Sequence, residues 1–485
     1  MSSLIKISLL LLVISQQTLG FEQTLGKNHF GHITFDQDMP VINKWITCHP
    51  DCSSKNNISL EMNNEIKPFL EILDSRGNTY ENYLVSSHGE GHELEVHYRS
   101  RNSSNEISQI IFRSDIENRF LETIIQSNNE VILKFDLQNH LSEEDIYGLG
   151  GIYNGTWLVR HFWEMVDDQG SEKISNLRKI DIKEGSWVGA RTRFWTFLIS
   201  PKNNNLLINE INELESRFQL TSSAEDGLHQ IRFYFGPVNT ELNRQDPELR
   251  ELIYSALWDW LRQLCFLIEW IFIWLLGLVG NEGLAILLLA CALKVLIYPL
   301  NRIAEKWQDD VNATQSVLQP QIDQIKNIFS GEEANHKIMQ LYKEKNISPF
   351  YSIKSLFGFL IQIPIFIAVF DVLGESIYLL EKSFFFIDDL SKPDQWANLP
   401  LFIPFFGDSL NLLPFCMMII SMLSAYLYTD KSLNKDLLSS QKRKLYLMSI
   451  LFFALLFTFP SGMVLYWTAS NFLQLAQMQI KKALQ

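Results

Sequence analysis

Long apolar runs fill the second half of this chain, and they constrain its fold more than any other feature. From about residue 252 to the end, Leu, Ile, Phe and Trp recur in stretches close to the ~20 residues that a helix needs to cross a bilayer. The part from residue 21 to about 250 is polar and strand-like, so the net charge of −14 averages two unlike halves. We therefore predict an aqueous domain at residues 21–245 and a membrane domain at residues 246–485.

The polar half has the pattern of a large antiparallel β-sandwich, in which short alternating or β-branched segments are separated by turn-rich stretches such as 74–78 and 200–205. The predicted strands lie at residues 94–98, 107–113, 130–137, 195–199 and 230–235. This half contains no GxSxG, HExxH or phosphate-cradling GxxxxGK motif, and no paired CxxC. The sequence therefore predicts no enzyme active site.

The first 20 residues resemble a signal peptide. Lys6 precedes an apolar core at residues 7–14, and small or polar residues follow at 15–20. An uncleaved N-terminal membrane anchor is the alternative. With either interpretation, the domain that follows is exported.

Two small groups of residues in the exported half could carry chemistry. Cys48 and Cys52 lie outside the apolar runs, and in an oxidising compartment a local disulfide is a better expectation than a metal or redox site. The second group could ligate zinc and consists of His88, Glu90, His92, Glu93 and His97. Because Gly89 and Gly91 favour a turn there, we interpret it as an exposed polar loop and predict no metal site.

Loop charges orient the predicted membrane spans, which lie at residues 284–300, 356–374, 412–428, 445–459 and 463–478. The loops between the first and second spans and between the third and fourth are rich in Lys and Arg, which places them in the cytoplasm. The segment 375–408 is acidic and, like the tight turn at 459–462, belongs outside. Five crossings then leave the N-terminal domain outside as well.

The segment at about 252–279 is as apolar as a span but contains Asp259, Arg262 and Glu269. A crossing here would reverse every later span or place the exported domain inside. We therefore predict an amphipathic helix on the outer membrane face, with its tryptophans at headgroup depth. A sixth span is the alternative.

The basic segment at about 301–348 predicts a cytoplasmic helical hairpin, with helices at 303–329 and 334–345 and a turn at Ser330 and Gly331. Pro320 should kink the first helix. The apolar residues expected to face one another are Leu318, Ile322, Ile325 and Phe329 on the first helix and Ile338, Leu341 and Tyr342 on the second. The hairpin could capture clients, and a purely structural hairpin is the alternative.

Short motifs along the chain resemble those of the YidC/Oxa1/Alb3 family of membrane protein insertases. In the polar half they are Trp-Val-Gly at 187–189 and Tyr-Phe-Gly-Pro at 234–237. In the apolar half they are Gly-Asn-Glu-Gly at 280–283, Tyr-Pro-Leu at 298–300, Leu-Gln-Pro at 318–320, Leu-Tyr-Lys at 341–343, Ser-Pro at 348–349, Leu-Ile-Gln-Ile-Pro-Ile-Phe at 360–366, Phe-Pro-Ser-Gly at 459–462, Val-Leu-Tyr at 464–466 and Ser-Asn at 470–471. Lys294 departs from the arginine usual in the family, Trp467 from a second tyrosine, and 350–355 from the usual glycines.

The resemblance implies an α+β chain of the bacterial inner membrane, with a periplasmic β-supersandwich ahead of five membrane helices. It implies an insertase and chaperone for inner-membrane proteins that is not an enzyme, needs no cofactor and does not hydrolyse ATP. The implied partners are nascent inner-membrane proteins and membrane lipids, with the Sec translocon and the ribosome as further candidates and no sequence-specific nucleic acid. A secondary transporter is the alternative, although such proteins usually have internal repeats and paired ion ligands.

The resemblance also implies a hydrated groove that is open to the cytoplasm and the lipid. Lys294 is its central residue, because a charge at mid-bilayer costs ~2.5–3.5 kcal/mol and needs water or a partner. Snorkelling of the lysine stem is the alternative, as is helix–helix hydrogen bonding for the polar residues of the last span. The implied groove residues are Lys294, Gln362, Tyr466, Trp467, Ser470, Asn471 and Gln474.

Overall fold

The structure is a computed structural model that divides into two compact units, and the boundary between them lies between Ile253 and Tyr254. We call them the β unit and the helical unit. The residues described are 21–25, 31–50, 52, 57–61, 68–79, 83–88, 93–115, 119–137, 162–167, 170–173, 180–212, 217–240, 242, 247–255, 257–348, 350–351, 356–404, 406–430, 433 and 435–484. The predicted signal peptide at 1–20 lies outside them. The domain boundary at residues 245–246 stays a prediction.

One large antiparallel sheet of nine strands organises the β unit. In spatial order its strands are β12 (Gly170–Lys173), β11 (Phe162–Asp167), β14 (Trp187–Arg191), β15 (Trp195–Lys202), β18 (Leu228–Pro237), β9 (Phe120–Ser127), β8 (Ile107–Asp115), β7 (Glu93–Ser100) and β6 (Tyr83–His88). Neighbouring side chains on β18 alternate between buried and partly exposed as far as Arg232, which is the pattern of a strand with one face on the core.

Two smaller sheets complete the β unit. One has the order β13 (Ile180–Ile182), β16 (Asn205–Asn212), β17 (Arg217–Ser223), β10 (Val131–Asp136) and β5 (Leu70–Leu73). The other has the order β1 (Phe21–Leu25), β2 (Gly31–Phe35), β3 (Ile42–Cys48) and β4 (Asn57–Glu61). A short helix, η2 (Pro247–Leu252), ends the unit.

Aromatic side chains join both smaller sheets to the large one. Trp45 on β3 lies 5.6 Å from Phe235 on β18, measured between ring centroids. Phe135 on β10 lies 6.1 Å from Phe233 on the same strand. Such pairs add to the area that they bury. The predicted division into a β-sandwich-like region followed by a helical region is confirmed. Four of the five predicted strands lie within β7, β8, β15 and β18, and the fifth, at 130–137, extends one residue beyond each end of β10.

Steric crowding explains why Gly189 and Gly236, in the two motifs of the polar half, are glycines. A Cβ at Gly189 would lie 1.9 Å from the carbonyl oxygen of Phe197 on the paired strand. A Cβ at Gly236 would lie 2.4 Å from the hydroxyl of Tyr234, which donates a hydrogen bond to the carbonyl of Pro237. Only glycine leaves room for these close approaches.

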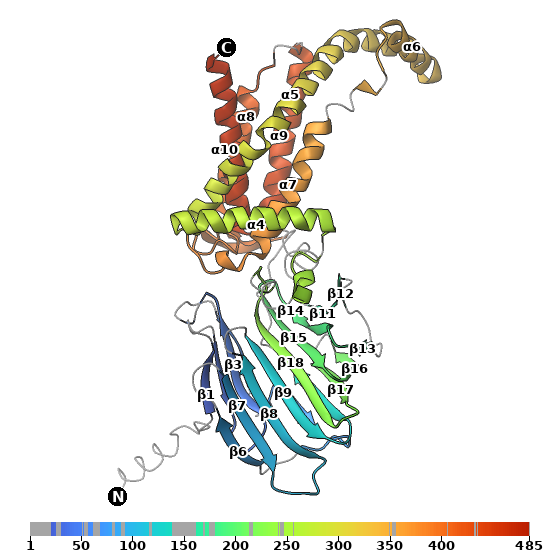
Figure 1. Cartoon of the computed structure of the whole chain (residues 1–485). Helices are drawn as coiled ribbons and strands as arrows, with labels where there is room; N and C mark the ends of the chain where they lie inside the picture. The colour runs from blue at the N-terminus through green and yellow to red at the C-terminus, as the bar shows by residue number, and fades with distance from the viewer. Residues whose placement is uncertain are drawn as a thin grey trace, which may run out of the picture. The chain divides into compact units, whose positions relative to one another are not determined.

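Long helices make up most of the helical unit, with a short two-stranded sheet between α7 and α8 (Figure 1). The elements are α4 (Asp259–Val279), α5 (Glu282–Ile328), α6 (Gly331–Glu344), α7 (Leu356–Glu375), η4 (Ile377–Leu379), β19 (Ala397–Ile403), β20 (Gly407–Leu410), α8 (Leu412–Leu427), α9 (Lys435–Leu456) and α10 (Ser461–Leu484). Three of the five predicted spans fall within α5, α7 and α10, and the other two, at 412–428 and 445–459, overlap α8 and α9 but extend past the ends of these helices. Among the described helices, α4 and α5 are long and apolar enough to cross a membrane by length and composition. The five crossings stay a prediction.

The helix α5 is longer than the sequence indicated. The predicted first span and the first hairpin helix form one helix of 47 residues that passes through Pro299 and Pro320. A proline removes one backbone hydrogen bond and bends a helix, but it need not end it. Figure 1 shows α5 curving over toward its C-terminal end, where α6 follows.

The helix α4 lies across one end of the other long helices of its unit (Figure 1). Its tryptophans are exposed, with Trp258 at 74% and Trp270 at 65%. Arg262 and Glu269 are buried instead. The buried face of α4 is therefore mainly apolar but includes Arg262 and Glu269, while its tryptophans point out, which suits a helix at a membrane interface.

Candidate functional site

Lys294 lies at the edge of the stripe by which α5 packs against its neighbours. Ala290 and Leu293 are buried, whereas Val295 and Leu296 are exposed, and Lys294 between them is partly buried. Within the part of the chain that the structure describes, Lys294 forms no ion pair. Its ammonium group is thus a single positive charge in the apolar part of α5, as the sequence predicts.

The predicted groove residues of α10 begin with an aromatic pair. Tyr466 is buried. The Trp467 ring lies 4.7 Å from the ring of Phe366 on α7 and 5.0 Å from that of Phe452 on α9, measured between centroids. Trp467 therefore joins three helices, and its large side chain fills the space between them.

The next polar residues of α10 divide between packing and exposure. The Asn471 amide donates a hydrogen bond of 2.9 Å to the hydroxyl of Ser421 on α8. Ser470 is partly buried, while Gln474 and, on α7, Gln362 are exposed. Asn471 thus makes the helix–helix contact that the sequence left open as an alternative to the groove.

The helices that carry these residues are neighbours, because α5, α7 and α8 all pack against α10. The structure therefore brings Trp467 and Asn471 into contact with adjacent helices. A single hydrated groove that includes Lys294 and Gln362 stays a prediction.

An apolar cluster joins α6 to the last turns of α5. Leu318, Ile322 and Leu341 are buried together, and Tyr342 packs against them. Pro320 lies within α5 between two members of the cluster. The predicted facing residues therefore meet in part. A role of this hairpin in capturing clients stays a prediction.

A short segment before β19 caps two helices, and sequence reasoning missed it. Asp394 accepts a hydrogen bond of 2.6 Å from the backbone N–H of Leu413, in the first turn of α8. The backbone N–H groups of Ser461 and Gly462, at the start of α10, donate to the carbonyls of Lys392 and Leu390, each at 2.8 Å. Burial raises the pKa of the Asp394 carboxyl, and the N–H donors of α8 oppose this rise. The Phe-Pro-Ser-Gly motif at 459–462 is thus a helix start that is capped from another loop.

A second missed feature is a set of buried charged residues on α4 and α7, two helices that pack against each other. Glu269 and Arg262 on α4 are buried, as are Asp371 and Glu375 on α7. The Tyr254 hydroxyl donates a 3.0 Å hydrogen bond to Glu269. Of the three charges that led the sequence to predict an interfacial helix, Arg262 and Glu269 are therefore buried in the protein, whereas the Asp259 side chain is exposed.

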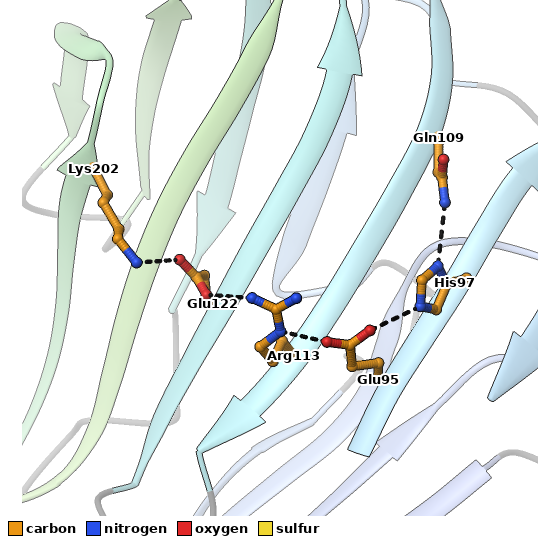
Figure 2. A network of polar contacts seen from close by, with 6 residues as sticks. All are labelled: Glu95, His97, Gln109, Arg113, Glu122 and Lys202. Carbon is orange, nitrogen blue, oxygen red and sulfur yellow. Dashed lines mark hydrogen bonds and ion pairs between the residues drawn. The ribbon is translucent and has the colours of Figure 1, made fainter. Parts of the chain in front are cut away.

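The β unit places its cysteine pair and its histidines apart from these helices. Cys48 and Cys52 form a disulfide in the structure, and the bridge stays a prediction for the protein in solution. Two members of the suggested zinc cluster, Glu90 and His92, lie outside the described residues. Figure 2 shows His97 in contact with Glu95 and Gln109, at 3.1 Å and 3.2 Å.

These contacts belong to a polar network that crosses four strands of the large sheet. The network consists of Glu95, His97, Gln109, Arg113, Glu122 and Lys202 (Figure 2). Arg113 bridges two carboxylates, Glu95 at 2.5 Å and Glu122 at 3.3 Å. The hydrogen bond from Arg113 is the largest of the effects that lower the pKa of Glu95.

A β-sandwich-like unit joined to a unit of long apolar helices defines an integral membrane protein with a large additional domain. Residues 274–485 match the family model described as 60Kd inner membrane protein. Two curated relatives are both called membrane protein insertase YidC. The one from Chlorobium phaeovibrioides is 25% identical over 72% of this chain and 61% of its own length. The one from Amoebophilus asiaticus is 29% identical over 61% of this chain and 51% of its own.

A solved structure described as an active YidC insertase, with its first transmembrane domain resolved, aligns over 99% of both chains at 18% identity and a TM-score of 0.36. The chain matches less than two thirds of the length of the curated relatives described above. The family model and these relatives thus show that the chain is similar to the 60Kd inner membrane protein family over residues 274–485 and to proteins named YidC insertase over a longer part of its length.

Proposed function

We propose that this protein inserts other membrane proteins into the bilayer through a hydrated groove made positive by Lys294. The match of residues 274–485 to the 60Kd inner membrane protein family and the name that the curated relatives share support the activity. The groove would be lined by the polar residues of α7 and α10 and would open to the cytoplasm and the lipid. The protein would act in the bacterial inner membrane, with the β unit in the periplasm, and would also assist folding.

The observation that carries the proposal is the position of Lys294. A lysine in an apolar helix costs ~2.5–3.5 kcal/mol unless water or a partner solvates it. The partial burial of Lys294, at the edge of the packed face of α5, leaves its ammonium group available to a polar segment that enters from one side.

The mechanism needs no bond chemistry. The short polar flank of a client enters the groove, where water and the charge of Lys294 reduce the cost of removing that flank from bulk solvent. The apolar segment of the client moves along the lipid-facing side of the helices. Its transfer into lipid supplies the free energy, ~25 cal/mol for each Å² of apolar surface buried, so ATP is not required.

The end of α5 and α6 would receive clients on the cytoplasmic side. Val317 and Ile328 are exposed on α5, and Met339 is exposed on α6, although the hairpin core is buried. These side chains offer apolar surface to a nascent span, while the exposed lysines around them keep the hairpin soluble.

An insertion assay in proteoliposomes tests the proposal. The client has one apolar span and a short acidic N-terminal flank, and its insertion rate is followed by protection of the flank from protease. Lys294→Arg should retain insertion because the charge remains, whereas Lys294→Leu should slow it about tenfold, as expected for the loss of ~1.4 kcal/mol of attraction.

Lys435→Leu is the control, because Lys435 is exposed at the start of α9, outside the predicted spans, the hairpin and the predicted groove residues. It should leave the rate unchanged. A Lys294→Leu protein that inserts acidic-flank and neutral-flank clients at the wild-type rate would mean that Lys294 only snorkels.

A secondary transporter is the second candidate, and the buried carboxylates of α4 and α7 favour it. Glu269, Asp371 and Glu375 could bind protons or cations in such a protein. Insertion in vesicles without any ion gradient separates the two functions. An insertase should work there at full rate, whereas gradient-dependent uptake of a small solute would favour the transporter.

A further inference from the structure

The segment between α7 and α8 exposes large apolar side chains that no part of the described chain covers. Phe385 is 88% exposed, and Leu401 at the end of β19 is 69% exposed. Trp396, Phe402 and Ile403 are exposed too. Soluble surfaces rarely gather so many large apolar groups in one segment, which points to a partner that is itself apolar.

Hydrogen bonds hold the base of the β19–β20 hairpin in place. Asn411 accepts a 3.0 Å hydrogen bond from the backbone N–H of Gln395 and donates a 2.6 Å bond to the carbonyl of Phe457, after the end of α9. Asp394 binds the first turn of α8. The hairpin is therefore fixed to the helix ends and cannot turn its apolar residues inward without breaking these contacts.

The position of the hairpin identifies the partner as lipid. Only Asn411 separates β20 from the apolar helix α8, which is a predicted span. The hairpin therefore lies where the chain enters the bilayer. Figure 1 shows the segment that contains it at the end of the helical unit crossed by α4, whose exposed tryptophans suit headgroup depth.

The hydrogen-bonding groups of the backbone limit how deep the β19–β20 hairpin can lie in the bilayer. A two-stranded sheet has two open edges, and unpaired N–H and C=O groups are not tolerated in the hydrocarbon core. Asp388 and Asp408 are also exposed in this segment. Only the interfacial zone satisfies both the apolar side chains and the open edges.

We propose that the β19–β20 hairpin, together with Phe385, inserts into the headgroup zone of the outer leaflet and forms a second interfacial anchor beside α4. The occupant of this apolar surface is the bilayer itself. The proposal rests on α8 as a membrane span and is independent of the insertase activity.

Depth-dependent fluorescence quenching in the full chain tests this proposal. All five native cysteines are replaced by serine, a single cysteine is introduced by Leu401→Cys or Phe385→Cys, and each is labelled with the fluorophore NBD. The proteins are reconstituted in phosphatidylcholine vesicles that carry nitroxides either near the headgroup or deep in the acyl chains. Arg76→Cys, with a 77% exposed side chain in the β unit, is the water reference. Val295→Cys, exposed in the middle of a predicted span, is the deep reference.

The expected result at residues 401 and 385 is emission shifted to the blue relative to residue 76, and at least twofold stronger quenching by shallow than by deep nitroxides. Residue 295 should show the opposite order. Emission like that of residue 76 without quenching would overturn the proposal. Blue-shifted emission that neither nitroxide quenches would overturn it as well, because protein would then cover the surface. Stronger quenching by the deep nitroxide would overturn the interfacial depth.

Discussion

A methyl group is too large for one position in the large sheet. Gly189 on β14 faces the backbone of β15 so closely that any Cβ would overlap the carbonyl of Phe197. The two strands are paired through this point, with Gly189 opposite Leu198. The backbone can relieve the overlap only by moving apart, which breaks ladder hydrogen bonds.

Gly189→Ala should therefore destabilise the β unit by about 1–3 kcal/mol, as overpacking does in well-packed cores. Thermal unfolding of the full chain in detergent, followed by protease sensitivity of the β unit, measures the change. Gly277→Ala on α4 adds the same methyl group to open space and should leave the unfolding of the β unit unchanged. A Gly189→Ala protein as stable as wild type would show that the strands separate at no cost.

At the scale of single residues, the sequence predicts what is unusual for its surroundings. Lys294 is a charge in an apolar run, and Cys48 and Cys52 are close together in a polar one, so both are visible without a structure. The capping role of Asp394 is not, because its partner Leu413 is 19 residues away, across a hairpin. The inward direction of Glu269 is hidden for a similar reason, since it depends on α7.

Helices and strands differ in how far the local sequence pattern predicts their length and their buried face. The strands follow from the two-residue period, since β7, β8 and β18 each have one face on the core. The length of α5 does not follow, because a proline in sequence favours a helix end and only packing on both sides of Pro299 keeps the helix continuous. The burial of Arg262 and Glu269 on α4 does not follow from a local pattern either, since these charged residues would otherwise be assigned to water.

The polar network on the large sheet should make the β unit sensitive to acid. Arg113 lowers the pKa of Glu95 below its usual value, so the contribution of this pair to stability is present above the unfolded pKa of about 4.5 and is lost as pH falls through the lower folded pKa. Both side chains are partly exposed, which limits the effect to less than about 1 kcal/mol.

Arg113→Met should remove part of the decrease in unfolding temperature between about pH 5 and pH 3. Arg76→Met is the control, because Arg76 pairs with Glu106 in a different contact. Thermal unfolding at a series of pH values measures both proteins. An Arg113→Met protein whose pH dependence matches wild type would show that Glu95 is not held by Arg113.

For the whole molecule, the loop charges predict which side of the membrane each connection occupies. Cysteines introduced at the exposed residues Lys337 on α6 and Lys435 on α9 should react with an impermeant maleimide only from the cytoplasm. A cysteine at the exposed Asp388 should react only from outside. Intact cells and inverted membrane vesicles, labelled in parallel in a cysteine-free background, separate the two sides. Labelling of Lys435→Cys from outside would require a different number of crossings.

The capping segment that ends at Asp394 limits how the helical unit can move. Its backbone and side chains bind the first turns of α8 and α10 at the same end, so spreading these helices at that end would break several hydrogen bonds at once. At the opposite end the described contacts of these two helices run to other partners: the Lys442 ammonium on α9 donates to the carbonyl of Tyr426 near the end of α8, and Lys481 on α10 pairs with Glu305 on α5. The segment 390–394 is therefore a shared clamp for the starts of α8 and α10, and a change in that segment would alter the spacing of both helices together.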